Sequence, residues 1–97
     1  MGTISDLKLV STEDKKELVT RLARIEGQLR GIQDMVQREE SCELVAQQLA
    51  AAREALSKAF SELVARTIER NCLSGKLADP AAREKLASIA KMLAKYA

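Results

Sequence analysis

The chain has 97 residues, of which 46% are hydrophobic, 31% are charged and 2% are aromatic, with 16 basic residues against 14 acidic ones. The scarcity of aromatic residues argues against a β-sandwich, and the high apolar fraction argues against a disordered chain. The absence of histidine excludes a Ser-His-Asp hydrolase, a histidine-based zinc site and a histidine pH switch. Because the formal net charge is only +2, any nucleic-acid binding must come from a local basic patch.

A single all-α domain of three helices is predicted over all 97 residues. Residues 1–10 are expected to form a flexible lead-in. A first helix follows over residues 12–38, with the hydroxyl of Ser11 or Thr12 at its start and acids in its first turn. Its apolar residues recur at spacings of three and four, which is a heptad pattern. They are Leu18, Leu22, Ile25, Leu29, Ile32 and Val36.

A second helix is predicted over residues 41–74, capped by Ser41, and its apolar residues follow the same spacing. They are Val45, Leu49, Ala52, Leu56, Ala59 and Leu63. A third helix over residues 80–96 begins at Asp79 and Pro80, a capping residue followed by one that is favoured in the first helical turn. Its apolar residues are Leu86, Ile89, Leu93 and Tyr96.

The two long helices and their short connection predict an antiparallel hairpin. A flat hairpin cannot cover both sides of its apolar stripes, so we expect two hairpins to pair as a four-helix bundle. Gly27 and Gly31 lie four residues apart near the first stripe. Since glycine lowers helix propensity, this pair indicates close approach of another backbone.

The chain carries no uncharged apolar run of about 18 residues, so no membrane-spanning helix is predicted. Its first residues lack the basic start and apolar stretch of a signal peptide. We therefore expect a cytoplasmic protein that makes no membrane contact. In a reducing compartment, Cys42 and Cys72 are either buried apolar residues or a redox or metal sensor.

The basic residues of the long helices allow two interpretations. Several stand three or four positions from an acid, which is typical of a solvated face with weak ion pairs within each helix. Such pairs are Glu17 with Arg21, Glu54 with Lys58, and Glu62 with Arg66. Alternatively, the cations form a phosphate-binding face that symmetry would multiply in an oligomer. Arg21 and Arg24 favour this second interpretation slightly, because they lie three apart with no acid between them.

The positions of the cysteines also suggest a function. Cys42 lies at the start of the second helix, where the helix dipole favours a thiolate. Cys72 lies near the other end of that helix, beyond disulfide reach within one subunit. If two copies of the helix run antiparallel, Cys42 approaches Cys72 of the partner subunit.

Two other classes of function stay open at this point. One is a helical scaffold or interaction module with inert cysteines. The other is a helical enzyme with a cationic pocket, although no pattern demands it. Its candidate residues are Gln47, Gln48, Arg53 and Lys58.

Residues 21–32 (RLARIEGQLRGI) resemble the signature of the CsoR/RcnR/FrmR family of bacterial transcriptional repressors. Cys42 and residues 47–53 (QQLAAAR) resemble that family's second helix, and the resemblance covers about residues 12–72. It implies a disc-shaped dimer of dimers that binds double-stranded operator DNA through basic faces and is released by an inducer. The residues it implies for DNA contact are Arg21, Arg24 and Arg53, with Lys15, Lys16 and Lys58 close by.

The sensor positions differ from those of the family's metal sensors. Cys42 aligns with the family's first sensor cysteine. Thr67 stands where metal sensors have a histidine, and Asn71 stands where copper sensors have a second cysteine, one residue before Cys72. A nickel or cobalt site needs several imidazoles and is excluded by composition.

Two thiols without histidine most resemble the persulfide-sensing, CstR-like branch of the family. On this resemblance, Cys42 is the sensing thiol and Cys72 of the partner subunit resolves its persulfide. The implied inducer is a small reactive sulfur species, and no resident cofactor is implied. Cu(I), bound linearly by Cys42 and Cys72, and formaldehyde are the alternative inducers.

Overall fold

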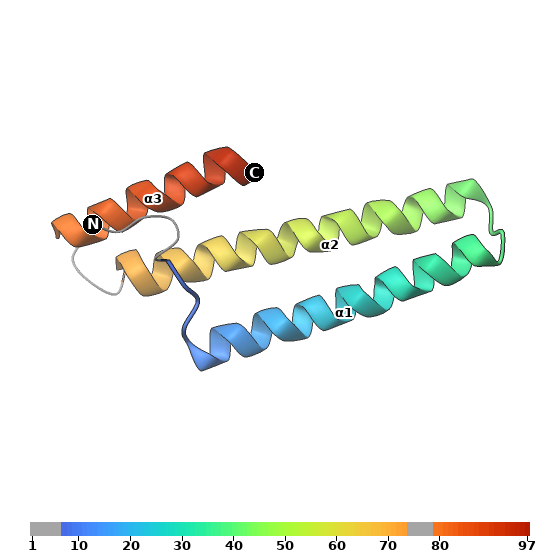
Figure 1. Ribbon diagram of the computed structural model, residues 1–97, viewed down its shortest axis with the longest axis horizontal. Coiled ribbons are helices and arrows are strands. Elements are labelled where there is room, and N and C mark those ends of the chain that lie inside the picture. The colour runs from blue at the N-terminus through green and yellow to red at the C-terminus, as the bar shows by residue number, and fades with distance from the viewer. Residues whose placement is uncertain (1–6, 74–78) are drawn as a thin grey trace.

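The computed structural model describes residues 7–73 and 79–97, without the side chains of Cys72 and Leu73. The described residues form three α-helices and one short π-helical segment (Figure 1). These are α1 (Thr12–Gln37), α2 (Cys42–Ile68), the π-helical segment η2 (Glu69–Leu73) and α3 (Pro80–Tyr96). The predicted all-α, three-helix architecture is confirmed. Residues 1–6 of the expected lead-in and residue 74, the expected end of the second helix, lie outside the described residues.

Each helix begins at a side-chain cap. In each case a side-chain oxygen accepts a hydrogen bond from a backbone amide two or three residues later, an amide that the first helical turn leaves without a helical partner. The pairs are Ser11 with Asp14 at 3.4 Å, Ser41 with Leu44 at 3.2 Å, and Asp79 with Ala81 at 3.1 Å. Between α1 and α2 the chain turns through Glu39, which adopts a left-handed φ of 59°.

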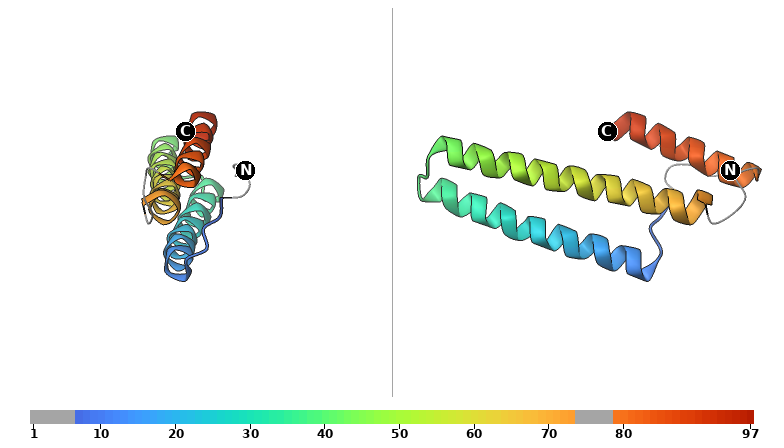
Figure 2. Two further views of the ribbon diagram at one scale, coloured as in Figure 1. Left: turned by 90° about the vertical axis from the view of Figure 1, so that its left-hand side faces the viewer. Right: turned by 180° about the vertical axis from the view of Figure 1, so that it is seen from behind.

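The helices form a flat, elongated molecule of 56 × 27 × 18 Å. The helices α1 and α2 run antiparallel as a hairpin, and α3 folds back along the carboxyl-terminal half of α2 (Figures 1 and 2). Within the described residues, α3 packs on α2 and on η2 but not on α1. None of the described helices is long and apolar enough to cross a lipid bilayer.

The heptad stripe of each long helix divides into two columns. Ile25 and Ile32 of α1 and Ala52 and Ala59 of α2 are buried, with exposed fractions of at most 6%. The alternating apolar positions stay open to solvent, with exposed fractions of 38–58%. These residues, which we call the exposed stripe, are Leu22, Leu29, Val36, Leu49 and Leu56. One hairpin therefore covers only one column of its own apolar residues.

A separate apolar cluster holds α3 against the end of α2. Val64 and Ile89 form its centre, and Ile89 is only 1% exposed. The partly buried residues around them are Leu7, Phe60, Ile68, Met92 and Leu93. In the predicted stripe of α3, Leu86 and Tyr96 remain exposed. The cluster therefore fixes α3 beside the end of α2 that leads into η2.

The α-helical pattern of the second helix ends at Ile68 and continues as a π-helix within the range predicted as one α-helix. Two side chains bond to the backbone carbonyl four residues before them. The Thr67 hydroxyl donates to the carbonyl of Leu63 at 2.7 Å, and the Asn71 amide donates to the carbonyl of Thr67 at 2.9 Å. Such bonds compete with the helical ladder and distort it, which gives a local reason for the change.

The two glycines of α1 make no close contact within the protomer. A Cβ added at Gly27 or Gly31 would meet no atom within 4 Å, apart from the helix's own nearby backbone. The close approach of another backbone, which the spacing of the glycines indicated, is therefore absent within the described protomer.

Candidate nucleic-acid interface and thiol site

A basic concavity lies over the amino-terminal half of α1. It has a volume of about 380 Å³ and includes three of the cations singled out from the sequence: Lys16, Arg21 and Arg24. Glu17, Thr20 and Glu62 complete its lining. Lys15 is exposed on the same helix but does not line the concavity. The fold thus gathers half of the predicted DNA-contacting residues on one surface.

The two predicted contacts on α2 lie elsewhere. Arg53 lines a second hollow of about 460 Å³, between α2 and the carboxyl end of α3. Its neighbours there include Leu56 of the exposed stripe, Phe60 and Tyr96. Lys58 is exposed and lines neither hollow. Within one protomer, therefore, Arg53 and Lys58 do not share the basic concavity.

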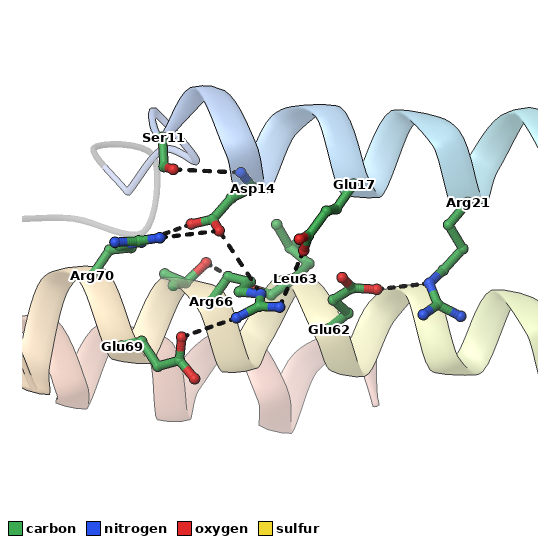
Figure 3. Close-up of polar contacts among 10 residues, drawn as sticks. Ser11, Asp14, Glu17, Arg21, Glu62, Leu63, Arg66, Glu69 and Arg70 are labelled. Atoms are coloured by element: carbon green, nitrogen blue, oxygen red, sulfur yellow. Dashed lines mark hydrogen bonds and ion pairs between the residues drawn. The ribbon is translucent and has the colours of Figure 1, made fainter.

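A row of ion pairs joins α1 to the end of α2, and we call it the charge ladder (Figure 3). At its first rung, Arg70 contacts both carboxylate oxygens of Asp14, at 2.9 and 3.3 Å. At the second, Arg66 lies 3.1 Å from Glu17, 3.3 Å from Glu69 and 3.8 Å from Asp14. At the third, Nε of Arg21 donates to Glu62 at 2.6 Å. In the first two rungs the acids that cross to α2 or η2, Asp14 and Glu17, lie on α1, whereas in the third rung α1 carries the base.

The charge ladder corrects two ion pairs predicted from spacing. Glu17 pairs with Arg66 instead of Arg21, and Glu62 pairs with Arg21 instead of Arg66. These four residues thus pair with one another between the helices, while Arg66 also contacts Glu69 three residues further along the chain. Aligning the two apolar stripes in antiparallel register could have indicated from the sequence that these residues exchange their ion-pair partners.

The surroundings of Asp14 keep its carboxylate ionised although its side chain is only 3% exposed. The hydrogen bond from Arg70 lowers the pKa of Asp14 below its ordinary value of 3.8, and this effect outweighs burial, which raises it. The pKa of Arg66 is raised, chiefly by its hydrogen bond to Glu69, and that of Arg70 by its hydrogen bond to Asp14. The ladder is therefore a set of charged groups that stabilise one another.

Cys42 is a free, exposed thiol at the first residue of α2. It opens into a hollow of about 310 Å³ whose other walls are mostly apolar. The lining residues are Val36, Glu40, Val45, Ala46 and Leu49. Cys42 is thus not a buried apolar residue in the protomer. Its hollow includes Val36 and Leu49 of the exposed stripe.

Cys72 belongs to η2, at the opposite end of α2 from Cys42. The intervening α2 has 27 residues, so about 40 Å of helix separates the two ends. One protomer therefore does not bring the two cysteines together. A π-helical turn closes through i→i+5 hydrogen bonds and takes up one more residue than an α-helical turn. Cys72 thus lies in a segment whose backbone winds differently from the α-helix before it.

Thr67 and Asn71 stand at the two positions where the resemblance places further metal ligands, and in this chain both side chains make hydrogen bonds to the backbone. Thr67 is buried and Asn71 is half-buried, and both donate their side-chain hydrogens to backbone carbonyls of the same helix. Among the side chains that the structure describes, which do not include that of Cys72, no three Cys, Asp or Glu groups gather in a way that could hold a metal ion.

Comparisons with known proteins agree with this architecture. Residues 14–95 match the sequence model of the metal-sensitive transcriptional repressors. Over 54 residues, or 56% of this chain, the sequence is 37% identical to the copper-sensing transcriptional repressor CsoR of Bacillus subtilis (strain 168). The matched region spans about half of that relative, 54% of its length.

Two solved structures resemble this chain over more than nine-tenths of its length. A variant of the formaldehyde-responsive regulator FrmR from Salmonella enterica serovar Typhimurium has a TM-score of 0.76 and 31% sequence identity, over 92% of this chain and 100% of that one. The nickel-responsive transcriptional regulator InrS has a TM-score of 0.73 and 28% identity, over 94% and 96% of the two chains. The chain therefore belongs to the family of metal-sensitive transcriptional repressors, as its resemblance to CsoR/RcnR/FrmR proteins indicated.

Proposed function

We propose that the protein is a cytoplasmic transcriptional repressor that binds operator DNA as a dimer of hairpin dimers. In this proposal, reactive sulfur species modify Cys42 and Cys72 and release the repressor from DNA. The observation that carries the DNA-binding part is the basic concavity, in which Lys16, Arg21 and Arg24 gather on one surface. Cations grouped in this way suit the phosphate backbone, and two-fold symmetry multiplies such a surface.

The exposed stripe supports assembly from identical copies. Its five residues are large and apolar, they lie on both helices of the hairpin, and each is at least 38% exposed. Pairing two hairpins would cover the same stripe on both copies and so complete a four-helix bundle. Through this assembly, Arg53 and Lys58 of one protomer are proposed to join the DNA-binding surface, since within one protomer they lie outside the basic concavity.

DNA binding is tested by fluorescence anisotropy with a duplex from the region upstream of the protein's own gene. The affinity of the wild type should fall steeply with salt, because phosphate contacts release counterions. Arg21→Ala, Arg24→Ala and Arg53→Ala should each abolish binding while helix content, measured by circular dichroism, stays unchanged. Lys85→Ala, on α3, is the control. Binding by the arginine variants that equals the wild type removes these residues from the interface, and a wild type that binds no duplex refutes the repressor function.

The sensing step is proposed to begin at the Cys42 thiolate, which is exposed and opens into an apolar hollow. The thiolate attacks a terminal sulfur of tetrasulfide. A bond forms between Sγ and that sulfur, one sulfur–sulfur bond of tetrasulfide breaks, and trisulfide leaves with the electron pair. The thiolate of Cys72 in the partner subunit then attacks Sγ of Cys42. The disulfide forms as the added sulfur leaves with the electron pair and a proton, as hydrosulfide. The two thiols are oxidised and one sulfane sulfur is reduced.

Two features of the chain support a role for Cys72. In an antiparallel pair of α2 helices, the end of one helix meets the start of the other, which would bring η2 toward Cys42 of the partner subunit. The segment η2 winds as a π-helix, which takes up one more residue per turn than an α-helix does, and we propose that this winding accommodates the additional residue between the cysteines. A covalent bridge between protomers would then bias the assembly toward a state that fits DNA poorly.

Cu(I) and formaldehyde are the alternative inducers, because CsoR of Bacillus subtilis is a copper sensor and FrmR responds to formaldehyde. Intact-protein mass spectrometry after separate exposure to Cu(I), tetrasulfide and formaldehyde distinguishes them, with DNA release measured in parallel. Tetrasulfide should join chains of the wild type on a non-reducing gel through a disulfide, from which the added sulfur has left as hydrosulfide. Cys72→Ser should keep the sulfur adduct on Cys42 without the disulfide cross-link, and Cys42→Ala should bind DNA but lose release. Release by tetrasulfide with neither a sulfur adduct nor a cross-link would refute the sulfur mechanism, and release only by Cu(I) or formaldehyde would replace it.

A further inference from the structure

The third rung of the charge ladder neutralises a residue of the basic concavity. Nε of Arg21 donates a hydrogen bond of 2.6 Å to Glu62, and the pair is partly accessible, with side-chain exposed fractions of 42% and 19% (Figure 3). Within the described chain, Glu62 is the only ion-pair partner of Arg21. In the absence of DNA, the guanidinium of Arg21 is therefore paired with the carboxylate of Glu62.

The other residues of the concavity differ from Arg21 in this respect. Lys16 and Arg24 have no ion-pair partner among the described residues. The second carboxylate of the lining, Glu17, is held by Arg66 at 3.1 Å. Glu62 is thus the one carboxylate of the concavity that is bonded to a cation of the basic surface.

A carboxylate and a phosphate compete for the same donors of a guanidinium. Both accept charge-assisted hydrogen bonds from the fork of N–H groups, and two-pronged binding uses Nε together with a terminal nitrogen. Since Nε of Arg21 is already bonded to Glu62, a phosphate that uses this edge must displace the carboxylate. Glu62 then lies beside the incoming phosphate as a second negative charge, which weakens the contact.

We propose that Glu62 is an internal competitor of operator phosphate for Arg21, so that the free protein is held in a partly neutralised state. This inference rests on the proposed DNA-binding function and assigns Glu62 a role that opposes it. The effect acts on the phosphate backbone and therefore concerns all duplex DNA, since backbone contacts dominate non-specific binding. Glu62 accordingly lowers the affinity for random duplexes as well as for the operator.

The inference is tested with Glu62→Gln, which removes the charge and keeps the shape, and with Glu62→Ala, which removes the hydrogen bond too. Glu84→Gln is the charge-matched control, because Glu84 is exposed on α3 and lines neither the basic concavity nor the hollow at Arg53. Anisotropy with the upstream duplex and with a random duplex is measured over a salt series. Both Glu62 variants should bind about three- to tenfold more tightly at low salt, as expected for the release of a partly exposed ion pair in each copy at the interface.

The salt dependence and a double variant show whether the gain passes through Arg21. Each freed guanidinium should steepen the slope of log affinity against log salt by up to about 0.9. In the Arg21→Ala background, Glu62→Gln should produce no more gain than Glu84→Gln does. If the upstream duplex no longer binds in that background, the comparison uses the low-salt random duplex.

The outcomes separate the two proposals. If both Glu62 variants retain wild-type helix content and bind DNA no more tightly than the wild type, competition is refuted, and weaker binding would show that Glu62 holds Arg21 in place for DNA. An equal gain in the Glu84→Gln control refutes it as well, because the effect would then be one of net charge. If the wild type binds no duplex at any salt concentration, the proposed function fails and the inference fails with it.

Discussion

Truncating Leu56 tests whether the exposed stripe is the surface on which two copies associate. Leu56 lies in the middle of α2 and is 46% exposed in the protomer. Full burial of a leucine side chain contributes about 1.5–3 kcal/mol, so covering the exposed half contributes about 1 kcal/mol. In a two-fold symmetric dimer both copies lose this contribution. Leu56→Ala should therefore weaken dimerisation by about 2 kcal/mol, which is about a 30-fold increase in the dissociation constant.

Sedimentation equilibrium over a concentration series measures this constant. Leu86→Ala is the matched control, because Leu86 is the same residue type with a similar exposed fraction of 41%, but lies on α3. Circular dichroism verifies that helix content is retained in both variants. An unchanged dissociation constant for Leu56→Ala, or an equal increase for both variants, would refute association through the exposed stripe of the hairpin.

Three further predictions concern the stability of the hairpin, each measured as the melting temperature Tm by circular dichroism. Because the pKa of Asp14 is depressed in the folded state, its stabilising effect is complete above pH 3.8 and is lost as the pH falls through the folded value. Tm should thus fall more steeply in acid for the wild type than for Asp14→Asn, and parallel profiles would contradict this. Glu39→Gly should raise Tm by several degrees, because glycine relieves a left-handed conformation that costs about 1 kcal/mol; a lower Tm would show that the φ of 59° costs nothing. Gly27→Ala should add about 0.5–1 kcal/mol, since the new methyl group meets open space in the protomer, and a loss of stability would indicate a partner at this surface.

The helices themselves could be predicted because their signals are local. Ser41 and Asp79 are capping side chains that act within one turn, and both cap the helices that the sequence assigned to them. The heptad spacing likewise identified the apolar residues that meet inside the hairpin, such as Ile25 and Ile32. It could not tell which half of each stripe would stay exposed, because that division depends on how the two helices are rotated against each other.

The ion pairs between the helices could not be predicted from sequence spacing, for a related reason. Glu17 stands four residues before Arg21 and, in the hairpin, also lies across from Arg66, and the sequence spacing describes only the first relation. Pairing between helices prevails where the antiparallel register brings opposite charges to the same level. The π-helical winding at Glu69–Leu73 was equally hidden, since it results from a departure of one residue in the hydrogen-bond ladder and has no periodic signature.

The open end of the hairpin is joined differently from the rest of it. From Ile25 onward, α1 meets α2 through buried apolar side chains, whereas the buried residue before Ile25 is the charged Asp14. The first turns of α1 are therefore tied to α2 largely by the charge ladder, whose partners are partly exposed and individually weak. Yet Asp14 itself is almost fully covered, so loss of Arg70 would leave a buried carboxylate with a weaker partner. Removing Arg70 should therefore loosen the first turns of α1 from α2. Arg70 belongs to η2, two residues before Cys72, so the backbone that carries the second proposed sensor thiol is also the backbone that anchors the ladder leading to Arg21.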